Sequence, residues 1–346
     1  MSIYQNLRES VRRVTDDTFE AVALEVFRYQ AFHNSIYRKF ISYLRINPEK
    51  VGSLAEIPFM PIGFFKHHSV LTNSPVVQTT FESSGTTGTQ TSRHHVADLD
   101  WYNEISLGIF EQTYGSLTDF HLLALLPSYL ERNNSSLVYM VQQFIAQTQS
   151  PVSGFFLHNV DELLTTLQKL AANPDGRKVI LWGVTFALLD LAESGEDLTG
   201  LAVGRLQNLA GLTVMETGGM KGRRREMLRE EVHEVLTTAF GVKTVHSEYG
   251  MTELLSQSYS KGNGIFETSA TMRILLRDIN DPRAVFATPQ SGLRYGGINV
   301  IDLANLDSCA FIETQDLGRY ASDDATEFEV IGRFDNSDVR GCNLLI

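Results

Sequence analysis

A run of hydroxyl side chains and glycines, Ser83-Ser84-Gly85-Thr86-Thr87-Gly88-Thr89, follows an apolar segment that is typical of a β-strand. Glycine tolerates positive φ, so successive backbone N–H groups in such a loop can converge on an anion. Phosphate oxygens can also accept hydrogen bonds from the four hydroxyls beyond Ser83, which belong to Ser84, Thr86, Thr87 and Thr89. The segment has neither the Gly-Lys-Ser/Thr of a Walker A loop nor the Gly-x-Gly-x-x-Gly of a dinucleotide site. It therefore predicts a phosphate-binding loop of another kind, with a solvated Ser/Thr turn as the alternative.

A second polar segment, Ser247-Glu248-Tyr249-Gly250-Met251-Thr252-Glu253, directly follows a short run that predicts a strand ending at His246. Loops at the carboxyl ends of strands are where open α/β sheets bind ligands. Here Tyr249 offers a flat ring face to a base and Thr252 a hydroxyl to a phosphate, while Glu253 offers a hard oxygen ligand to Mg²⁺. The pattern predicts part of a nucleotide site, and a tight glycine turn with a surface glutamate is the alternative.

Two later segments carry polar residues beside predicted strands: Glu313-Thr314-Gln315-Asp316-Leu317-Gly318 and Gly332-Arg333-Phe334-Asp335-Asn336-Ser337-Asp338-Val339-Arg340-Gly341. An ionised aspartate at a strand end, such as Asp316, can accept hydrogen bonds from both hydroxyls of a ribose. Arg333 can donate charged hydrogen bonds to the ribose or to a phosphate. Taken alone, the aspartate could equally be a turn residue and the arginine a surface charge.

The elements that must position these segments alternate along most of the chain. From about Val76 onward, the predicted helices are 99–114, 136–148, 160–172, 186–193 and 225–240. The predicted strands are 76–81, 121–126, 152–157, 179–184, 212–216, 243–246, 272–275, 299–302, 310–313 and 327–331. Such alternation indicates an α/β architecture with a largely parallel sheet. The residues before Val76 instead predict helices, followed by an extended turn between Pro58 and Pro61.

Composition limits the classes of protein that remain. The chain has 346 residues, of which 43% are hydrophobic, and a net charge of −12. An acidic chain repels phosphodiester backbones and anionic lipid, so we expect no nucleic-acid partner, although one cleft can be locally positive. We expect no membrane span, because no apolar run approaches the roughly 20 residues that cross a bilayer. We expect no secretion signal, because Met1–Ser10 carries Arg8 and Glu9 and lacks an apolar h-region. Two cysteines, Cys309 and Cys342, form no disulfide framework, so we expect a cytoplasmic protein.

The order of the motifs resembles that of the adenylate-forming superfamily of acyl-CoA synthetases, luciferases and peptide-synthetase adenylation domains. The resemblance implies ATP and Mg²⁺ as cofactors, with Thr86 and Thr87 acting in catalysis and Glu253 as the metal ligand. It assigns the nucleotide contacts to Ser83, Ser84, Gly85, Gly88, Thr89, Gly218, Gly219, Tyr249, Gly250, Thr252, Asp316 and Arg333. It also implies the fold, which is the large α/β domain of that superfamily with mixed sheets flanked by helices.

Within the superfamily, the chain resembles acyl-protein synthetases of the LuxE type. The similarity lies in the segments 57–66, 83–93 and 126–132 and in the Arg340-Gly341-Cys342 ending. It implies activation of a carboxylic acid, typically fatty, and transfer of the acyl group to a cysteine, which Cys342 matches. It also suggests an acyltransferase and an acyl reductase as partners. As a domain division we expect a helical segment over 1–75, the adenylation domain over 76–330 and a hinge-like tail over 331–346.

One expected departure from the superfamily leaves other functions open. We expect the mobile C-terminal domain, which carries a catalytic lysine, to be missing; Lys221 could compensate or could simply be solvated. A stand-alone acid–CoA ligase of the phenylacetate type and a non-catalytic nucleotide-binding subunit are therefore the alternative functions. We expect His67, His68, His94 and His95 to be surface or loop residues. For His246, Trp182 and Phe186, the sequence allows either core packing or an acyl pocket, and for Cys342 either an acyl acceptor or a packed apolar residue.

Overall fold

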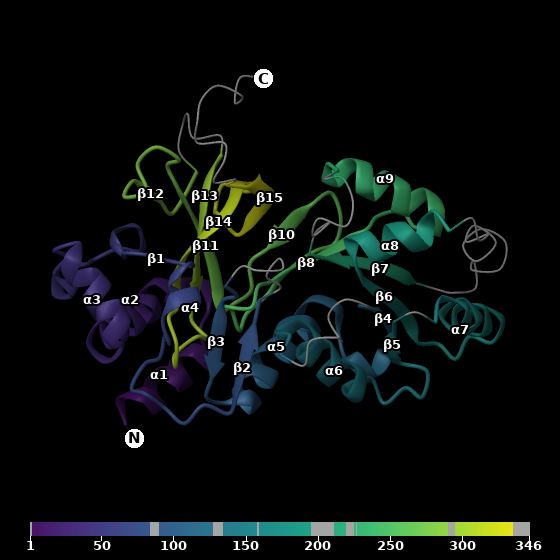
Figure 1. Cartoon of the computed structure of the whole chain (residues 1–346), viewed down its shortest axis with the longest axis horizontal. Coiled ribbons are helices and arrows are strands. Elements are labelled where there is room, and N and C mark those ends of the chain that lie inside the picture. Colours follow the sequence, from purple (N-terminus) through teal and green to yellow (C-terminus); the bar gives the residue numbers. More distant parts are fainter. Residues whose placement is uncertain are drawn as a thin grey trace. The chain divides into compact units, whose positions relative to one another are not determined.

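The structure is a computed structural model that describes residues 2–83, 90–126, 134–157, 159–194, 211–218, 225, 227–289 and 295–334. The chain divides into two compact units. We call Val77–Phe266 the central unit, and Met1–Val76 together with Glu267–Ile346 the terminal unit (Figure 1). The boundaries expected at 75/76 and 330/331 for the functional domains stay predictions.

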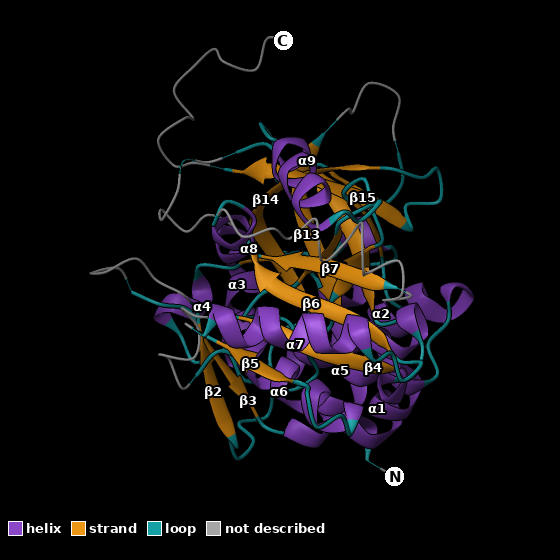
Figure 2. Ribbon diagram, turned by 90° about the vertical axis from the view of Figure 1, so that its right-hand side faces the viewer, coloured by secondary structure: helices purple, strands orange, loops and turns teal. Residues whose placement is uncertain are grey.

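The central unit is built on a sheet whose inner strands run parallel. The strands follow the order β10-β9-β8-β7-β6-β4-β5, and Figure 2 shows β7, β6, β4 and β5 succeeding one another. Their bounds are β4 (Phe120–Leu125), β5 (Gly154–Phe156), β6 (Lys178–Val184), β7 (Leu212–Thr217), β8 (His246–Tyr249), β9 (Ser258–Ser260) and β10 (Ile265–Glu267). Every residue of β4, and all of β6 except Lys178, is buried. This burial is typical of parallel strands that are covered on both faces.

Helices cover both sides of this sheet. In the view of Figure 1, α8 and α9 lie above the strands, and α5 and α6 lie below them. The helices are α5 (Leu99–Tyr114), α6 (Ser136–Thr148), α7 (Val160–Ala172), α8 (Thr185–Ala192) and α9 (Arg229–Phe240), with a 3-10 turn, η3 (Leu117–Asp119). The Asp98 side chain caps α5 by accepting from Trp101 N at 2.9 Å, and Gly115, at φ 92°, ends it. The predicted bounds of α5, α6 and α7 are confirmed. For α5, these end signals explain why.

The hydroxyl-rich segment is bracketed by a small antiparallel hairpin. Its strands are β2 (Thr79–Glu82) and β3 (Arg93–Val96), with Phe81 opposite His94. At the open end of the hairpin, Ser83 N donates to Ser92 O at 3.0 Å and Ser92 N donates to Ser83 Oγ at 2.9 Å. Ser83 and Ser92, which lie at the open ends of the two strands, are thus held side by side.

The terminal unit carries an antiparallel sheet, in the order β12-β11-β13-β14-β15. The strands are β11 (Met272–Arg277), β12 (Val285–Phe286), β13 (Gly296–Asp302), β14 (Phe311–Tyr320) and β15 (Glu327–Arg333), and β1 (Met60–Pro61) pairs with β14 in parallel. The prediction of a largely parallel sheet is therefore wrong for this unit. The reason is that β13, β14 and β15 are joined by short connections, whereas parallel neighbours need crossovers of about a dozen residues or more.

The N-terminal helices pack against this antiparallel sheet. They are α1 (Ile3–Arg12), α2 (Asp16–His33), α3 (Ser35–Tyr43) and α4 (Phe64–His67), with 3-10 turns η1 (Pro48–Lys50) and η2 (Leu54–Glu56). The Phe311 ring of β14 contacts the rings of Phe27 and Tyr37 at centroid distances of 5.9 and 6.1 Å. Buried Gln30 donates to the carbonyl oxygen of Asn305 at 2.9 Å and accepts from Ala310 N at 2.9 Å. The helical segment and the last strands therefore share one core.

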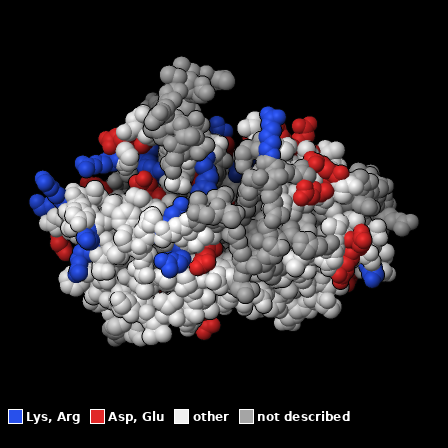
Figure 3. All heavy atoms as spheres, in the orientation of Figure 1, with Lys and Arg blue, Asp and Glu red and all other residues white. Residues whose placement is uncertain are grey.

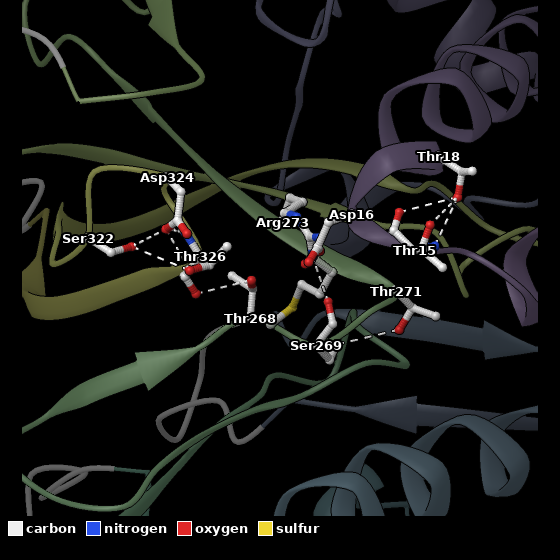
Figure 4. A network of polar contacts seen from close by, with 11 residues as sticks. Thr15, Asp16, Thr18, Thr268, Ser269, Thr271, Arg273, Ser322, Asp324 and Thr326 are labelled. Atoms are coloured by element: carbon white, nitrogen blue, oxygen red, sulfur yellow. Dashed lines mark hydrogen bonds and ion pairs between the residues drawn. The ribbon is translucent and has the colours of Figure 1, made fainter.

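Polar contacts at the edge of this core join α2 to β11 (Figure 4). The Arg273 guanidinium donates to Asp16 and lies over the Phe19 ring, with Cζ 4.4 Å from the centroid. In the β14–β15 turn, Asp324 accepts from Ser322 Oγ at 2.6 Å. Hydrogen bonds from Ser322 and Thr326 lower the pKa of the exposed Asp324 carboxyl to about 2.

The acidic charge of the chain is not uniform over its surface. On the face drawn in Figure 3, Lys and Arg side chains lie beside Asp and Glu side chains. The net charge of −12 therefore leaves room for a local attraction of anions. Within the described ranges, no helix combines the length and the apolar character needed to cross a membrane.

Candidate nucleotide and acyl-transfer site

The Tyr-Gly-Met-Thr-Glu segment leaves the carboxyl end of β8. The prediction of a strand over 243–246 is wrong, because β8 begins at His246, and pairing with β7 and β9 carries it to Tyr249. Tyr249 is 8% exposed, and its ring centroid lies 5.9 Å from that of Phe266. Residues 250–253 then form the turn that the sequence predicted at the end of a parallel strand.

A buried carboxylate lies directly beneath this turn. Glu248 accepts a hydrogen bond from the Thr217 hydroxyl at the end of the neighbouring strand β7. A Cβ atom on Gly250 would meet Glu248 Oε1 at 2.2 Å, so the carboxylate occupies the space that any other residue at position 250 would need. Burial raises the pKa of Glu248 to about 7, and the charge of Glu216 adds to the rise while the Thr217 hydrogen bond opposes it.

Glu216, at the end of β7, is a second buried carboxylate with different partners. It accepts from Thr185 Oγ1 at 2.7 Å, and His233 Nε2 of α9 lies 3.9 Å from its Oε1. Burial alone would raise the pKa of Glu216, but His233, Thr185 and the charge of Arg229 hold it below its ordinary value. No role was predicted for Glu216 or Glu248. The signal that could have identified them is a glutamate near the end of each of two neighbouring strands.

Thr252, in this turn, is hydrogen-bonded to the β2–β3 hairpin. The carbonyl oxygen of Thr252 accepts from His94 Nδ1 at 2.8 Å, and the Glu253 side chain that follows is buried, with 4% of the residue exposed. His94 is 1% exposed, so the prediction that it is a surface or loop residue is wrong. The burial of His94 was not predicted because the sequence of β3, Arg93-His94-His95-Val96, is mostly polar and shows no apolar alternation.

The glycine turn after β7 begins with a backbone that favours glycine. Gly218 has φ 78°, in the left-handed region that side chains rarely adopt. Several predicted site residues lie outside the described residues, namely Ser84, Gly85, Thr86, Thr87, Gly88, Thr89, Gly219 and Cys342, as does Lys221. Their roles stay predictions.

Asp316 and Arg333 face each other on neighbouring strands of the terminal unit. Asp316 lies within β14, not at a strand end as expected, because the strand continues for four residues beyond it to Tyr320. The ladder places it opposite Arg333 of β15, whose Nε is 3.2 Å from Asp316 Oδ1. The Asp316 side chain is 12% exposed and that of Arg333 is 70% exposed.

A buried arginine supports the strand that carries Asp316. Arg277 donates to Thr314 O at 2.6 Å and to Ile298 O at 2.9 Å, and Thr314 Oγ1 in turn accepts from Asp316 N at 3.1 Å. A Cβ on Gly297 would meet Arg277 Cζ at 2.4 Å, so this glycine provides the space for the guanidinium. Sequence reasoning missed Arg277, although a lone arginine after the apolar run 274–276 was a signal.

The remaining candidates lie in buried surroundings. His246 Nδ1 is 3.1 Å from the Tyr114 hydroxyl, and burial, with the charge of Lys261, lowers the pKa of His246 to about 4. Trp182 and Phe186 are 0% and 2% exposed, which places both in the core. Cys309 is fully buried, and burial raises the pKa of its thiol to about 12.

No metal cluster is preformed in the part of the chain that the structure describes. There, no group of three or more His, Cys, Asp or Glu side chains could hold an ion. Mg²⁺ is usually bound through one or two carboxylates together with substrate phosphates and water. A single carboxylate such as Glu253 therefore fits that manner of binding.

Comparison with solved structures shows the kind of fold. The chain is similar to AtGH3.15 acyl acid amido synthetase in complex with 2,4-DB, with a TM-score of 0.50 at 10% identity over 96% of this chain and 70% of that chain. It also matches an adenylation domain of a keto acid-selecting NRPS module bound to keto acyl adenylate, with a TM-score of 0.46 at 12% identity over 73% of this chain and 52% of that one. The first match shows that the chain shares the mixed α/β fold of that protein. A search of the curated proteins gave no significant match.

A family model shows the family to which the chain belongs. The model for acyl-protein synthetase, LuxE, matches residues 10–346, which is nearly the whole chain. The chain belongs to the LuxE family of acyl-protein synthetases.

Proposed function

We propose that this protein uses ATP to activate a fatty carboxylic acid as an acyl-adenylate and then transfers the acyl group to a cysteine thiol of a protein. The observation that carries the proposal lies in the central unit. There the turn 250–253 leaves the carboxyl end of β8 and is hydrogen-bonded, through His94 and Thr252, to the hairpin that brackets the hydroxyl-rich segment. This hydrogen bond joins the turn that contains Glu253 to the β2–β3 hairpin, and membership of an acyl-protein synthetase family supports the acyl chemistry.

In the first step, a carboxylate oxygen of the acid attacks the α-phosphorus of ATP. The new C–O–P linkage forms as the bond between the α-phosphorus and the bridging oxygen breaks, and pyrophosphate leaves with that electron pair. Positioning and charge neutralisation dominate such transfers. We assign phosphate binding to Thr86, Thr87 and the backbone of their loop. Glu253 would hold Mg²⁺, which when bound supplies positive charge to the phosphate oxygens.

The nucleoside half of ATP has its own proposed contacts. Tyr249 and the glycine turn at Gly218 would take the base, and Asp316 would accept hydrogen bonds from the ribose hydroxyls. The Asp316–Arg333 pair supports the ribose role because the guanidinium helps to orient the carboxylate.

In the second step, a thiolate attacks the acyl carbonyl carbon. A thioester C–S bond forms, the C–O bond to the phosphate breaks, and AMP leaves. Of the two cysteines, Cys309 is a poor nucleophile because its thiol is buried and its pKa is raised to about 12. We therefore propose Cys342 as the acceptor on this chain, beside the Arg340 charge that favours the thiolate.

Incubation with a fatty acid, ATP and Mg²⁺, followed by mass analysis of the protein and of small thiols, tests this proposal. We expect a hydroxylamine-sensitive acyl adduct that Cys342→Ser abolishes while pyrophosphate exchange persists. Cys309→Ser is the matched control and should spare both. Acyl-CoA as the product when CoA is added would instead indicate an acid–CoA ligase, and ATP binding without any acyl product would indicate a nucleotide-binding subunit.

A further inference from the structure

One buried glutamate, Glu248, contacts the ends of two neighbouring strands in the central unit. Thr217 is the last residue of β7, and the parallel ladder places it beside Glu248 of β8, so the two side chains lie on the same face of the sheet. The Thr217 hydroxyl donates to Glu248 Oε2 across a sequence separation of 31 residues. The next residue after Thr217 is Gly218, whose φ is 78°. The carboxyl group of Glu248 therefore holds the residue from which the glycine turn starts.

The other oxygen of the same carboxyl group lies against the turn that leaves β8. Glu248 Oε1 occupies the space that a Cβ atom on Gly250 would need, so only glycine admits the carboxyl group there without a shift. One carboxyl group thus spans two backbone segments, with Oε2 bound at the end of β7 and Oε1 packed against Gly250. A shift of either segment relative to the other would break one of these contacts.

Burial makes a carboxyl group a costly way to join two strand ends. Glu248 is 8% exposed, and burial raises the pKa of its carboxyl group to about 7, against the opposing effect of the Thr217 hydrogen bond. Apolar side chains would fill the same space without the cost of removing a polar group from water. A polar group that carries such a cost at a strand end favours a role in ligand binding over a role in stability alone.

A second threonine–glutamate pair provides an internal comparison. Thr185 Oγ1 donates to Glu216 at 2.7 Å, also between buried residues that are 31 positions apart. Glu216 precedes Thr217 on β7, so its side chain points to the opposite face of the sheet, where His233 of α9 lies beside it. Thr185 is the first residue of α8. This pair joins β7 to helices, whereas the Thr217–Glu248 pair joins the two strands whose ends carry the proposed base contacts.

We propose that Glu248 is a positioning residue, which holds Gly218 and Tyr249 in the relative placement that one adenine ring requires. The inference rests on the proposed function, in which these two residues take the base of ATP. Tyr249 lies between Glu248 and Gly250 in the chain, so the contact of the carboxyl group with Gly250 limits the backbone conformation at Tyr249. Loss of the bridge should weaken binding of the nucleoside half of ATP and leave binding of the triphosphate half unchanged.

Calorimetry with ATP and with inorganic tripolyphosphate, each with Mg²⁺, separates the two halves of the nucleotide. Thr217→Val nearly keeps the shape of the side chain and removes the donor to Glu248. Thr185→Val is the matched control, which removes the donor to Glu216. We expect Thr217→Val to weaken ATP binding by about tenfold, the size of one lost hydrogen-bonded contact, with the tripolyphosphate affinity of wild type. Thr185→Val should bind both ligands as wild type does.

Two substitutions of the glutamate itself give a second test. Glutamine keeps the shape of the side chain and an oxygen acceptor for Thr217, so Glu248→Gln should bind ATP as wild type does. Glu248→Leu loses both oxygens and should bind ATP about tenfold more weakly. This comparison decides if wild type binds ATP but not tripolyphosphate, and Thr217→Val decides if Glu248→Leu does not fold.

Several results would overturn the inference. A folded Thr217→Val protein with unchanged ATP affinity would contradict it, as would a loss in Glu248→Gln as large as that in Glu248→Leu. An equal loss for ATP and tripolyphosphate, or an equal loss in Thr185→Val and Thr217→Val, would show a merely structural role. Wild-type protein that binds no ATP would contradict the proposed function itself, whereas the results for the variants would leave that function intact.

Discussion

The central and terminal units place their predicted ligand-binding residues in different ways. In the central unit, strands β7 and β8 run parallel, and Gly218 and residues 250–253 follow their carboxyl ends. In the terminal unit, Asp316 and Arg333 lie opposite each other inside an antiparallel ladder. Parallel strands gather functional turns at one edge because all their carboxyl ends meet there. An antiparallel pair instead presents its side chains from a strand, so their position depends on register.

The carboxylates of the two units also have different partners. Glu248 is buried and receives a hydrogen bond from the neutral Thr217 hydroxyl, whereas Asp316 is paired with the exposed Arg333 guanidinium. A buried carboxylate with a neutral partner favours its protonated form. The central unit should therefore respond to pH near neutrality through Glu248, and perturbations there should exceed those at the Asp316–Arg333 pair.

The largest expected effect is the pH dependence of stability that Glu248 causes. Its pKa is raised from 4.5 to about 7 in the folded protein, so the stabilisation is complete below pH 4.5 and is lost as the pH rises through 7. The loss is on the order of 3 kcal/mol. Glu248→Gln should remove it, so the variant should gain stability relative to wild type between pH 4.5 and 8 in urea unfolding experiments.

Two other groups nearby also change the stability with pH. The effect of Glu248 is therefore measured as the difference in the free energy of unfolding between Glu248→Gln and wild type at each pH. His246, with its pKa lowered to about 4, contributes in the opposite direction, because its stabilisation is complete above pH 6.5 and is lost as the pH falls through 4. Glu216, whose pKa is also lowered, acts below pH 4.5. A difference between Glu248→Gln and wild type that stays constant with pH would show that Glu248 titrates normally.

A smaller effect is expected from the contact beneath the turn. Gly250→Ala would force the Glu248 carboxylate away from Thr217, at a cost of about 1–3 kcal/mol in the free energy of unfolding. Gly63→Ala in the terminal unit is the matched control, since a Cβ there meets nothing within 4 Å. Equal stability of the two variants in denaturant unfolding would mean that the close approach of Glu248 to Gly250 is not a constraint.

The Asp316 prediction concerns binding. Asp316→Ala should weaken ATP binding by about tenfold through lost ribose contacts, and equally with and without Mg²⁺. Glu253→Gln should instead raise the Mg²⁺ concentration required, because an amide is a poorer ligand for a hard cation. Calorimetric titration separates the two behaviours, and an unchanged ATP affinity in Asp316→Ala would refute the ribose assignment.

The smallest expected effect belongs to Arg333. Its side chain is 70% exposed, and ion pairs in such surroundings contribute about 0–1 kcal/mol. Arg333→Gln should therefore change the unfolding midpoint little at low salt and not at all at high salt. A large destabilisation would show that the Asp316–Arg333 pair contributes as much to the free energy of unfolding as the buried contacts of the central unit do.

Features that depend on interactions between residues close in the sequence could be predicted, and features that depend on contacts between distant residues could not. The bounds of α5 were predictable because Asp98 and Gly115 provide local start and stop signals. The full length of β8 was not, since Ser247 and Glu248 are polar and become strand only by pairing with β7 and β9. Each motif segment was recognised in the sequence by itself. The His94–Thr252 hydrogen bond was not, because no local pattern records a contact across 158 residues.

Acid-dependent exchange of labelled pyrophosphate into ATP tests the central claim most directly. A panel of aliphatic and aromatic acids would be assayed with Mg²⁺, in wild type and in Cys342→Ser. If the chain forms acyl-adenylates, label should enter ATP only when a suitable acid is present, with longer aliphatic acids most effective, and at the same rate in both proteins. Absence of exchange with every acid, in protein that is folded and binds ATP, would contradict adenylate formation.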